Sequence, residues 1–375
     1  MPLIGPTCGV NNKHCPNTVR VVLIIRLFKT TLLLIPALLT VMQPPAYAET
    51  APTVSAASCV VMYEDGRTVY EKDPDARSLI ASTTKLMTAL VCLENARLDD
   101  CVTVPPACCQ VEGSSMYLKA GERYTVRELL LGLLLASGND AALALAQHVS
   151  GSAESFVRLM NEKAEGLSLN QTHFANPHGL DAPGHYSTAR DLARVMLACM
   201  ENESFRTLAS TKSAVLGGTA FLNHNKLLQT CPGCVGGKTG YTEAAGRCLV
   251  SCCERGGMRF VCVTLSDPDD WRDHRTLYDW AFASYRLFDP ARELRLDVPL
   301  VSGDRNTVPV EPEAAGRLLL PTGETVRLEA ELPRFVFAPV TKGERAGTLR
   351  VIVGQRTVGE FGLVYGQSAP MAISF

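Results

Sequence analysis

The chain has 375 residues, of which 46% are hydrophobic and 20% are charged, and its formal net charge is −2. This composition supports a folded core and excludes wholesale disorder, and the lack of a basic excess argues against nucleic-acid binding. The length is enough for two domains, or for one large domain with a smaller one.

The first 48 residues differ in character from the rest of the chain. They contain no Asp or Glu, and four basic residues precede an apolar run from Leu32 to Met42. The pattern Ala46-Tyr47-Ala48 follows, as at secretory cleavage sites. A transmembrane anchor is the alternative, but this run is too short to span a bilayer and contains Pro36. We therefore expect residues 1–48 to be a signal peptide, removed to leave an exported chain.

Twelve of the fourteen cysteines lie beyond residue 48. Export permits disulfides, although their connectivity cannot be read from a sequence. The pair in Cys231-Pro232-Gly233-Cys234 is of a kind found in redox and metal sites. No second such pair and no His at zinc-ligand spacing accompanies it, so we expect no metal. Cys248, Cys252 and Cys262 lie among Val and Leu, which favours buried free thiols.

The next part of the chain carries a hairpin signal and then helix signals. Residues 59–63 and 68–70 flank Glu64-Asp65-Gly66-Arg67, and Asp-Gly is a strong hairpin-turn signal. Thr125 and Glu128 predict a capping box. Four segments that are apolar almost all round are predicted to be helices: 82–94, 129–136, 141–149 and 187–200.

Strand signals return late in the chain. Residues 247–253 and 259–265 predict a second hairpin, and 274–287 predict a closing helix. Strands at both ends with helices between them imply an α/β layered domain whose sheet is assembled from both ends. Beyond Phe288 the short alternating runs and frequent Pro and Gly predict a small all-β module. We therefore expect a domain over 49–288 and a β-rich domain over 289–375.

The first motif that carries chemistry is Ser82-Thr83-Thr84-Lys85 at the start of a predicted helix. The i, i+3 spacing puts Ser82 and Lys85 on one face. A serine hydroxyl needs a base, and a lysine serves only when its pKa is lowered by burial or nearby positive charge. The apolar neighbours of Lys85 fit such burial. The alternative is a helix cap beside an exposed lysine.

Two later motifs complete the set. Ser137-Gly138-Asn139 follows an apolar helix, where a hydroxyl and an amide can relay a proton and bind a substrate amide; an ordinary helix end is the alternative. Lys238-Thr239-Gly240 follows two glycines, so a strand edge there can lie close to a ligand whose carboxylate the lysine and threonine bind. The alternative is a glycine-rich turn.

The joint occurrence of the three motifs in this order resembles the penicillin-binding proteins and β-lactamases. Longer stretches resemble the low-molecular-weight D-alanyl-D-alanine carboxypeptidases of peptidase family S11. These stretches are 80–90, Ser137-Gly138-Asn139-Asp140-Ala141-Ala142, 176–181, 187–192 and Gly237-Lys238-Thr239-Gly240-Tyr241-Thr242. The resemblance covers roughly residues 55–288. It implies a β-lactamase/transpeptidase-like domain, an antiparallel sheet with helices on both faces, followed by a small C-terminal all-β domain.

The resemblance also implies roles for these residues. Ser82 would attack the carbonyl between two D-alanines, Lys85 would be the base, and Ser137 with Asn139 would assist. Lys238 and Thr239 would hold the terminal carboxylate, within a substrate-binding segment that includes Gly240, Tyr241 and Thr242. The backbone N–H groups of Ser82 and Tyr241 would form the oxyanion hole. Substrates would be peptidoglycan stem peptides, β-lactams would inhibit, and neither metal nor cofactor would be needed.

Four further residues invite a His/Asp charge system: His178, Asp181, His185 and Asp191. We interpret them as structural, because the lysine already fills the base role and Asp191 suits the first turn of its helix. The sequence ends at Met371-Ala372-Ile373-Ser374-Phe375 without the basic amphipathic helix by which many members lie on the membrane. The enzyme would therefore be free after cleavage, or tethered by a retained N-terminal segment.

Two other functions remain open at this point. A β-lactamase shares the acylation chemistry but needs an efficient base for deacylation, and the middle of the chain has no obvious Glu-x-x-x-Asn to supply it. A catalytically silent scaffold that binds the cell wall would carry the same fold, but the intact motifs argue against it.

Overall fold

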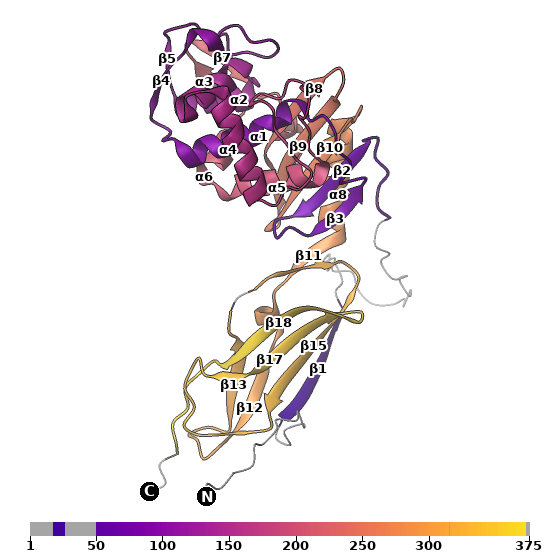
Figure 1. Cartoon of the computed structure of the whole chain (residues 1–375). Helices are drawn as coiled ribbons and strands as arrows, with labels where there is room; N and C mark the ends of the chain where they lie inside the picture. The colour runs from indigo at the N-terminus through magenta and orange to yellow at the C-terminus, as the bar shows by residue number, and fades with distance from the viewer. Residues whose placement is uncertain (1–17, 27–49, 315, 373–375) are drawn as a thin grey trace, which may run out of the picture. The chain divides into compact units, whose positions relative to one another are not determined.

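The computed structural model of the chain describes residues 18–26, 50–314 and 316–372 (Figure 1). These residues fall into two compact units, one of residues 50–283 and one of residues 18–26 with 284–372. Each unit has its own hydrophobic core.

A five-stranded antiparallel sheet of order β3-β2-β10-β9-β8 organises the first unit. Its strands are β2 (Ser58–Tyr63), β3 (Thr68–Lys72), β8 (Cys234–Thr242), β9 (Gly246–Arg255) and β10 (Met258–Leu265). Both predicted hairpins form, β2 with β3 and β9 with β10. Strand β10 pairs with β2, from Phe260 opposite Tyr63 to Leu265 opposite Ser58. The sheet is therefore assembled from both ends of the unit, as expected.

Helices cover both faces of this sheet. Helix α5 (Ala189–Glu201) contacts β2 and β10, on the face where Val250 and Cys252 join the main core. Helix α8 (Asp270–Ser284) covers the other face, where the Ser251 hydroxyl lies 2.8 Å from Nδ1 of His274 and 2.8 Å from the hydroxyl of Tyr278. Successive strand residues point to opposite faces, so the nearly unbroken apolar run of β9 fits burial on both. The predicted fold class is confirmed.

The remaining helices form most of the rest of this unit, away from α8. They are η1 (Ala81–Thr84), α1 (Lys85–Asn95), η2 (Pro106–Cys108), α2 (Val126–Leu135), α3 (Asn139–Ser150), α4 (Ala153–Gly166), α6 (Glu203–Ala209) and α7 (Leu227–Thr230). The predicted capping box forms: the Glu128 N–H donates to Thr125 Oγ1 at 3.2 Å, and the Glu128 carboxylate accepts from the Thr125 N–H at 2.7 Å. It begins α2, whose far end leads to the Ser-Gly-Asn motif.

Four short strands form two pairs beside these helices, β4 with β5 and β6 with β7. They are β4 (Cys101–Thr103), β5 (Arg123–Thr125), β6 (Ser213–Leu216) and β7 (Thr219–Leu222). Helix α4 was not expected from the sequence. Its buried residues Phe156, Met160 and Ala164 have the i, i+4 spacing of one helix face, and this pattern would have revealed the helix.

The second unit is a seven-stranded sheet of order β1-β15-β17-β18-β13-β12-β16, with β11 paired to β14. Its elements are β1 (Thr18–Arg26), β11 (Tyr285–Phe288), α9 (Pro290–Glu293), β12 (Leu296–Val301), β13 (Thr307–Pro312), β14 (Leu318–Pro321), β15 (Thr325–Pro333), β16 (Val336–Phe337), β17 (Arg345–Val353) and β18 (Arg356–Tyr365). Alternate residues of β15, from Val326 to Leu332, enter the core. The predicted β-rich module is present.

Two segments at the edges of this unit differ from what the sequence suggested. Residues 285–287 were expected to end the closing helix, but they begin β11, which pairs antiparallel with β14. Strand β1 lies within the expected signal peptide and pairs with β15, from Thr18 opposite Pro333 to Arg26 opposite Thr325. The other residues of segment 1–48 lie outside the described residues, so its cleavage stays a prediction.

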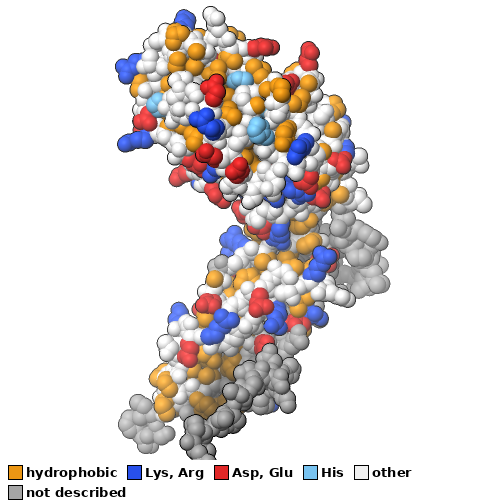
Figure 2. Space-filling view, in the orientation of Figure 1, with side chains coloured by type: hydrophobic (Ala, Val, Ile, Leu, Met, Phe, Trp, Pro, Cys, Tyr) orange, Lys and Arg blue, Asp and Glu red, His pale blue; other side chains and the backbone are white. Residues whose placement is uncertain are grey.

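The surface carries charge of both signs. Figure 2 shows acidic and basic side chains interspersed over its visible face, as expected for a chain with a small net charge. None of the helices in the described ranges is long and apolar enough to cross a membrane.

Candidate active site

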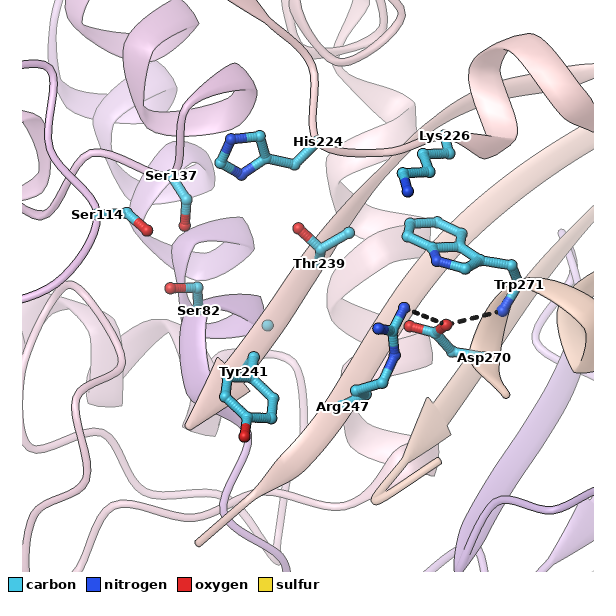
Figure 3. A pocket seen from close by; sticks show the side chains of 11 residues that line it. Ser82, Ser114, Ser137, His224, Lys226, Thr239, Tyr241, Arg247, Asp270 and Trp271 are labelled. Carbon is cyan, nitrogen blue, oxygen red and sulfur yellow. Dashed lines mark hydrogen bonds and ion pairs between the residues drawn. The ribbon is translucent and has the colours of Figure 1, made fainter. Parts of the chain in front are cut away.

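A cleft of about 630 Å³ opens beside the start of η1 and the edge strand β8 (Figure 3). Its lining joins residues that are far apart in the chain: Ser82, Ser114, Ser137, His224, Lys226, Thr239, Gly240, Tyr241, Arg247, Asp270 and Trp271. The three sequence motifs therefore meet in one cavity, although they are spread over more than 150 residues.

Ser82 lies in the 3₁₀ turn that leads into α1. The residue before it, Ala81, has a left-handed φ of 45°, which is strained for a residue with a side chain. Gly179 packs against this strained point, because a Cβ there would lie 2.1 Å from the carbonyl oxygen of Ala81. Gly179 belongs to stretch 176–181, one of the stretches that resemble the family. This stretch thus supports the backbone that presents Ser82.

Lys85 Nζ has three polar partners. It lies 2.8 Å from Ser82 Oγ, 2.6 Å from Asn139 Oδ1 and 2.6 Å from the backbone carbonyl oxygen of His178. The side chain is fully buried. An amine with two acceptors and one hydroxyl around it can be neutral with every group satisfied, because its two N–H groups face the acceptors and its lone pair faces the hydroxyl.

The electrostatic surroundings favour that neutral form. Burial, and then the positive charge of Lys238, lower the pKa of Lys85 well below its usual range, while Asp140 acts weakly in the opposite direction. The pKa of Lys238 is also lowered, to about 7, because that side chain is buried too. Two buried amines close together cannot easily both carry a proton, so the pair favours one charge over two.

Ser137 and Asn139 flank the start of α3. Ser137 has a left-handed φ of 62° and lines the cleft, and Figure 3 shows its side chain near that of Ser82. Asn139 does not line the cleft. Its Oδ1 accepts from Lys85 and its Nδ2 donates to the carbonyl of Glu112 at 2.6 Å, so its amide orientation is fixed from both ends.

Strand β8 forms the opposite wall. Gly240 lies so close to the serine turn that a Cβ would be 3.0 Å from both the Ile80 carbonyl oxygen and the Ser82 backbone nitrogen. Thr239, Gly240 and Tyr241 line the cleft, as the sequence led us to expect of a substrate-binding strand. Glycine at 240 is what lets the strand approach the nucleophile.

Two of the five expected substrate-binding residues lie outside the lining. Lys238 is buried beneath the wall, where its Nζ donates to the Thr239 carbonyl at 2.7 Å. Thr242 donates through Oγ1 to Asp181 Oδ1 at 3.1 Å and accepts from the Ala245 N–H at 3.0 Å. Its contacts hold the end of β8 to the loop that carries Gly179.

The histidines and acidic residues outside the three motifs make structural contacts. The Ala175 N–H donates to His185 Nδ1 at 3.0 Å, so the other ring nitrogen carries the proton and donates to Thr84 Oγ1 at 2.8 Å. Burial lowers the pKa of both His178 and His185 to about 4, which keeps them neutral. Asp191 lies in the first turn of α5 and accepts from Thr172 and from the Gln171 N–H.

Several lining residues were missed by the sequence analysis. Arg247 Nη2 donates to Asp270 Oδ1 at 2.7 Å, and its guanidinium lies 5.8 Å from the centre of the Trp271 ring. His224 and Lys226 come from the segment before α7. No motif or spacing marks these residues, because only the tertiary structure brings them to the cleft: Arg247 through the pairing of β9 with β8, and Asp270 and Trp271 through the start of α8.

The arrangement can perform acyl transfer. It places the Ser82 hydroxyl beside an amine that can be neutral, and a second lysine lies behind the opposite wall. A strand edge also lies next to the serine backbone N–H. A nucleophile, its base and a polar strand edge beside one open cavity are the parts that such a reaction requires. Among the described residues, no group of three or more His, Cys, Asp or Glu side chains could hold a metal ion.

Comparison with protein families places the chain among enzymes of this kind. The family model described as D-alanyl-D-alanine carboxypeptidase, Peptidase_S11, matches residues 45–269. The D-alanyl-D-alanine carboxypeptidase DacF of Bacillus subtilis (strain 168) is 33% identical over 342 residues, which are 84% of this chain and 88% of the relative. The carboxypeptidase of Streptomyces sp. (strain K15) is 36% identical over 64% of this chain and 91% of its own length.

Comparison with solved structures agrees with this family assignment. Penicillin binding protein 5 from Haemophilus influenzae superposes with a TM-score of 0.68 and 28% identity over 86% of this chain and 99% of that protein. The carboxypeptidase DacD from Francisella tularensis superposes with a TM-score of 0.67 and 25% identity over 90% of this chain and 98% of the other.

Proposed function

The chain belongs to peptidase family S11, the D-alanyl-D-alanine carboxypeptidases, and we propose that Ser82 is the nucleophile with which it performs that activity. It is a serine-type enzyme that removes the terminal D-alanine from peptidoglycan peptides, and it binds penicillin. The observation that carries the proposal is the 2.8 Å contact between Ser82 Oγ and the buried amine of Lys85.

Neutral Lys85 is the general base in this proposal. Its N–H groups donate to Asn139 Oδ1 and to the His178 carbonyl, which leaves its lone pair to accept the Ser82 proton. The serine oxygen then attacks the carbonyl between the two D-alanines. Ser137, on the same side of the cleft, passes a proton on to the nitrogen of the departing D-alanine.

The opposite wall binds the substrate. Thr239 presents its hydroxyl to the terminal carboxylate, and protonated Lys238 supplies positive charge from behind the strand. Because Lys238 is buried, its charge acts through a poorly screening medium. Binding a carboxylate stabilises that charge, so a substrate with a free terminal carboxylate is preferred.

The backbone N–H groups of Ser82 and Tyr241 stabilise the tetrahedral intermediate. The close approach of Gly240 to the Ser82 nitrogen supports this assignment. Such donors are worth about 3 kcal/mol each in the transition state. Collapse releases D-alanine, and water hydrolyses the acyl-enzyme; penicillin acylates the same serine and leaves slowly.

A turnover comparison tests the proposal. We expect release of D-alanine from diacetyl-Lys-D-Ala-D-Ala to exceed nitrocefin hydrolysis, and Ser82→Ala to lower that release at least about a thousandfold. Ser78→Ala is the matched control, because that hydroxyl bonds only weakly to the Ala76 carbonyl, at 3.4 Å, outside the cleft.

Other results would favour the alternatives. Rapid nitrocefin hydrolysis without release of D-alanine would indicate a β-lactamase. A folded protein that neither releases D-alanine nor is labelled by fluorescent penicillin would indicate a wall-binding scaffold.

We further propose that the enzyme acts outside the cytoplasm, in the cell wall or periplasm, where peptidoglycan shapes the cell. The basic and then apolar segment before Glu49 supports export. The intact mass of the protein isolated from its cell should correspond to a chain that begins at Glu49. A chain retaining residues 1–48 in the membrane fraction would indicate a tether, and one retaining them in the cytoplasm would contradict export.

A further inference from the structure

Three cysteines meet where the edge strand β8 begins, away from the catalytic cleft. Cys231 ends α7, Cys234 is the first residue of β8, and Cys253 lies on β9 directly opposite Cys234. The Sγ atoms of Cys231 and Cys253 are 3.7 Å apart. All twelve cysteines of residues 50–314 are free thiols in the structure.

The turn between Cys231 and Cys234 holds these thiols together. The Cys234 N–H donates to the Cys231 carbonyl at 3.1 Å, and the Glu254 N–H donates to the Gly233 carbonyl at 2.8 Å. Gly233 has a φ of +80°, and a Cβ there would lie 2.3 Å from the Glu254 carbonyl oxygen. A glycine is therefore required for the turn to lie flat on β9, which carries both cysteines over Cys253.

The environment of Cys231 and Cys234 differs from that of the other buried cysteines. Arg255 Nη2 lies 3.4 Å from Cys231 Sγ. The hydrogen bond with Cys253 and the charge of Arg255 lower the pKa of Cys231 to about 7, and contact with Cys253 also lowers the pKa of Cys234. Burial instead raises the pKa of Cys253, and that of isolated thiols such as Cys92. Thiolates are the reactive form, so the reactive members of the cluster are Cys231 and Cys234.

Accessibility assigns the order of reaction. Cys253 is fully buried and Cys231 is 5% exposed, whereas Cys234 is partly exposed. A solution oxidant therefore meets Cys234 first, and only Cys253 lies next to both of the other thiols.

We propose that Cys231, Cys234 and Cys253 form a thiol–disulfide exchange site that reacts with low-molecular-weight disulfides. The Cys234 thiolate attacks one sulfur of the small disulfide, forming a mixed disulfide and releasing one thiolate. Cys253 passes its proton to the neighbouring Cys231 thiolate and attacks the Cys234 sulfur, which joins Cys234 to Cys253 and releases the second thiolate. Cys231 then loses that proton to solvent, and its thiolate attacks Cys253, which joins Cys231 to Cys253 and frees Cys234.

The electron balance is that of a two-electron oxidation. The protein loses two thiol hydrogens, and the small disulfide becomes two thiols. The final bond ties the turn before β8, the strand that carries Lys238 and Thr239, to β9. The proposal does not depend on the catalytic role of Ser82.

Peptide mapping of the oxidised full-length chain tests it. The reduced protein is incubated with oxidised glutathione, alkylated and digested with trypsin without reduction. We expect peptide 227–238, which holds Cys231 and Cys234, to be linked to peptide 248–255, and fragmentation to place the bond between Cys231 and Cys253. Separate, fully alkylated peptides would overturn the proposal.

Single cysteine variants test the role of each thiol in the exchange. Cys253→Ser should abolish the link, whereas Cys252→Ser, which alters the neighbouring thiol on the other face of β9, should leave it intact. Cys234→Ser should give the same product at least about tenfold more slowly. Cys231→Ser should move the link to Cys234, which tests the site even where Cys253→Ser does not fold. A link that persists in Cys253→Ser, or is lost in Cys252→Ser, would refute the assignment.

Discussion

Lys85 and Lys238 show why this site depends on burial more than on residue type. An exposed lysine is protonated at neutral pH and cannot act as a base. Here burial removes the hydration of both amines, and the charge of Lys238 lowers the pKa of Lys85 further. In the proposed mechanism the two lysines therefore take different roles: Lys85 is neutral beside the nucleophile, and Lys238 carries its charge behind the opposite wall of the cleft.

The dependence of kcat/KM on pH should report both lysines. Lys85 acts only when neutral, so activity should fall as pH decreases through its lowered pKa. Lys238 acts only when protonated, so activity should also fall as pH rises above its pKa of about 7. We therefore expect a bell-shaped profile for diacetyl-Lys-D-Ala-D-Ala, measured by D-alanine release between about pH 5 and about pH 10.

Lys238→Met separates the two limbs of that profile. This variant should lose the alkaline limb and about a hundredfold in kcat/KM, because the positive charge behind the carboxylate-binding wall is absent. A profile that is flat in the wild type, or an alkaline limb that survives in the variant, would contradict the assigned roles.

The sequence predicted most of the residues that act in the site, because their chemistry comes in short motifs. Ser82, Lys85, Ser137 and Thr239 were all expected, and they lie in or beside one cleft. The second acceptor of Lys85 could not be predicted, since it is the backbone carbonyl of His178, which any residue type could supply.

At the scale of elements, strand β8 and the serine turn act as one unit. Gly240 allows the strand to lie against the Ser82 backbone, and Thr242 anchors its far end to Asp181. Position along the sheet matters as well, since β8 is an edge strand with one neighbour, β9. An edge strand has free polar groups along one side, and these can bind an extended peptide.

Gly240→Ala tests that close approach. The added Cβ would lie about 3.0 Å from the Ser82 nitrogen and so push β8 away from the nucleophile. We expect kcat/KM to fall roughly tenfold to a hundredfold, because small misplacements of reacting groups are costly. Stability should fall by less than about 2 kcal/mol, as for other modest overpacking.

Gly166→Ala is the matched control for this change. No atom lies within 4 Å of its Cβ position, so activity should be unchanged. Equal activity of Gly240→Ala and wild type would show that the strand does not need to lie so close to Ser82.

Elements with local signals were predicted well, and those fixed by tertiary contacts were not. The Asp-Gly turn and the Thr125 capping box predicted β2–β3 and α2 from neighbouring residues alone. Helix α8 begins at Asp270 rather than at the expected 274, and its end was misplaced, since residues 285–287 have helix-compatible side chains but pair with β14 instead. That pairing joins segments about 30 residues apart, which no local pattern reports.

At the scale of the whole molecule, the chain divides into two units with separate cores. The lining of the catalytic cleft comes entirely from residues 82–271, within the first unit. The second unit has a separate core. The domain boundary suggested by composition was 288/289, and contacts divide the chain between 283 and 284. Strand β1 was not predicted, because its basic and apolar residues equally fit a leader segment.

Removal of the second unit should therefore leave the chemistry intact. A chain of residues 49–284 retains the sheet, α8 and the cleft, and the Streptomyces relative aligns over most of its own length with only 64% of this chain. We expect its rate of acylation by fluorescent penicillin to remain within about threefold of the full chain, as for a domain that folds alone. A folded product that is not labelled would show that the second unit completes the site.

Mass spectrometry of the penicillin adduct tests the central claim most directly. Trypsin releases the nucleophile in peptide 78–85, and fragmentation distinguishes Ser82 from Ser78, Thr83 and Thr84. The protein should gain one benzylpenicillin, attached at Ser82, and Ser82→Ala should gain none. An adduct on any other residue, or a wild-type protein that stays unmodified, would contradict the account of the site.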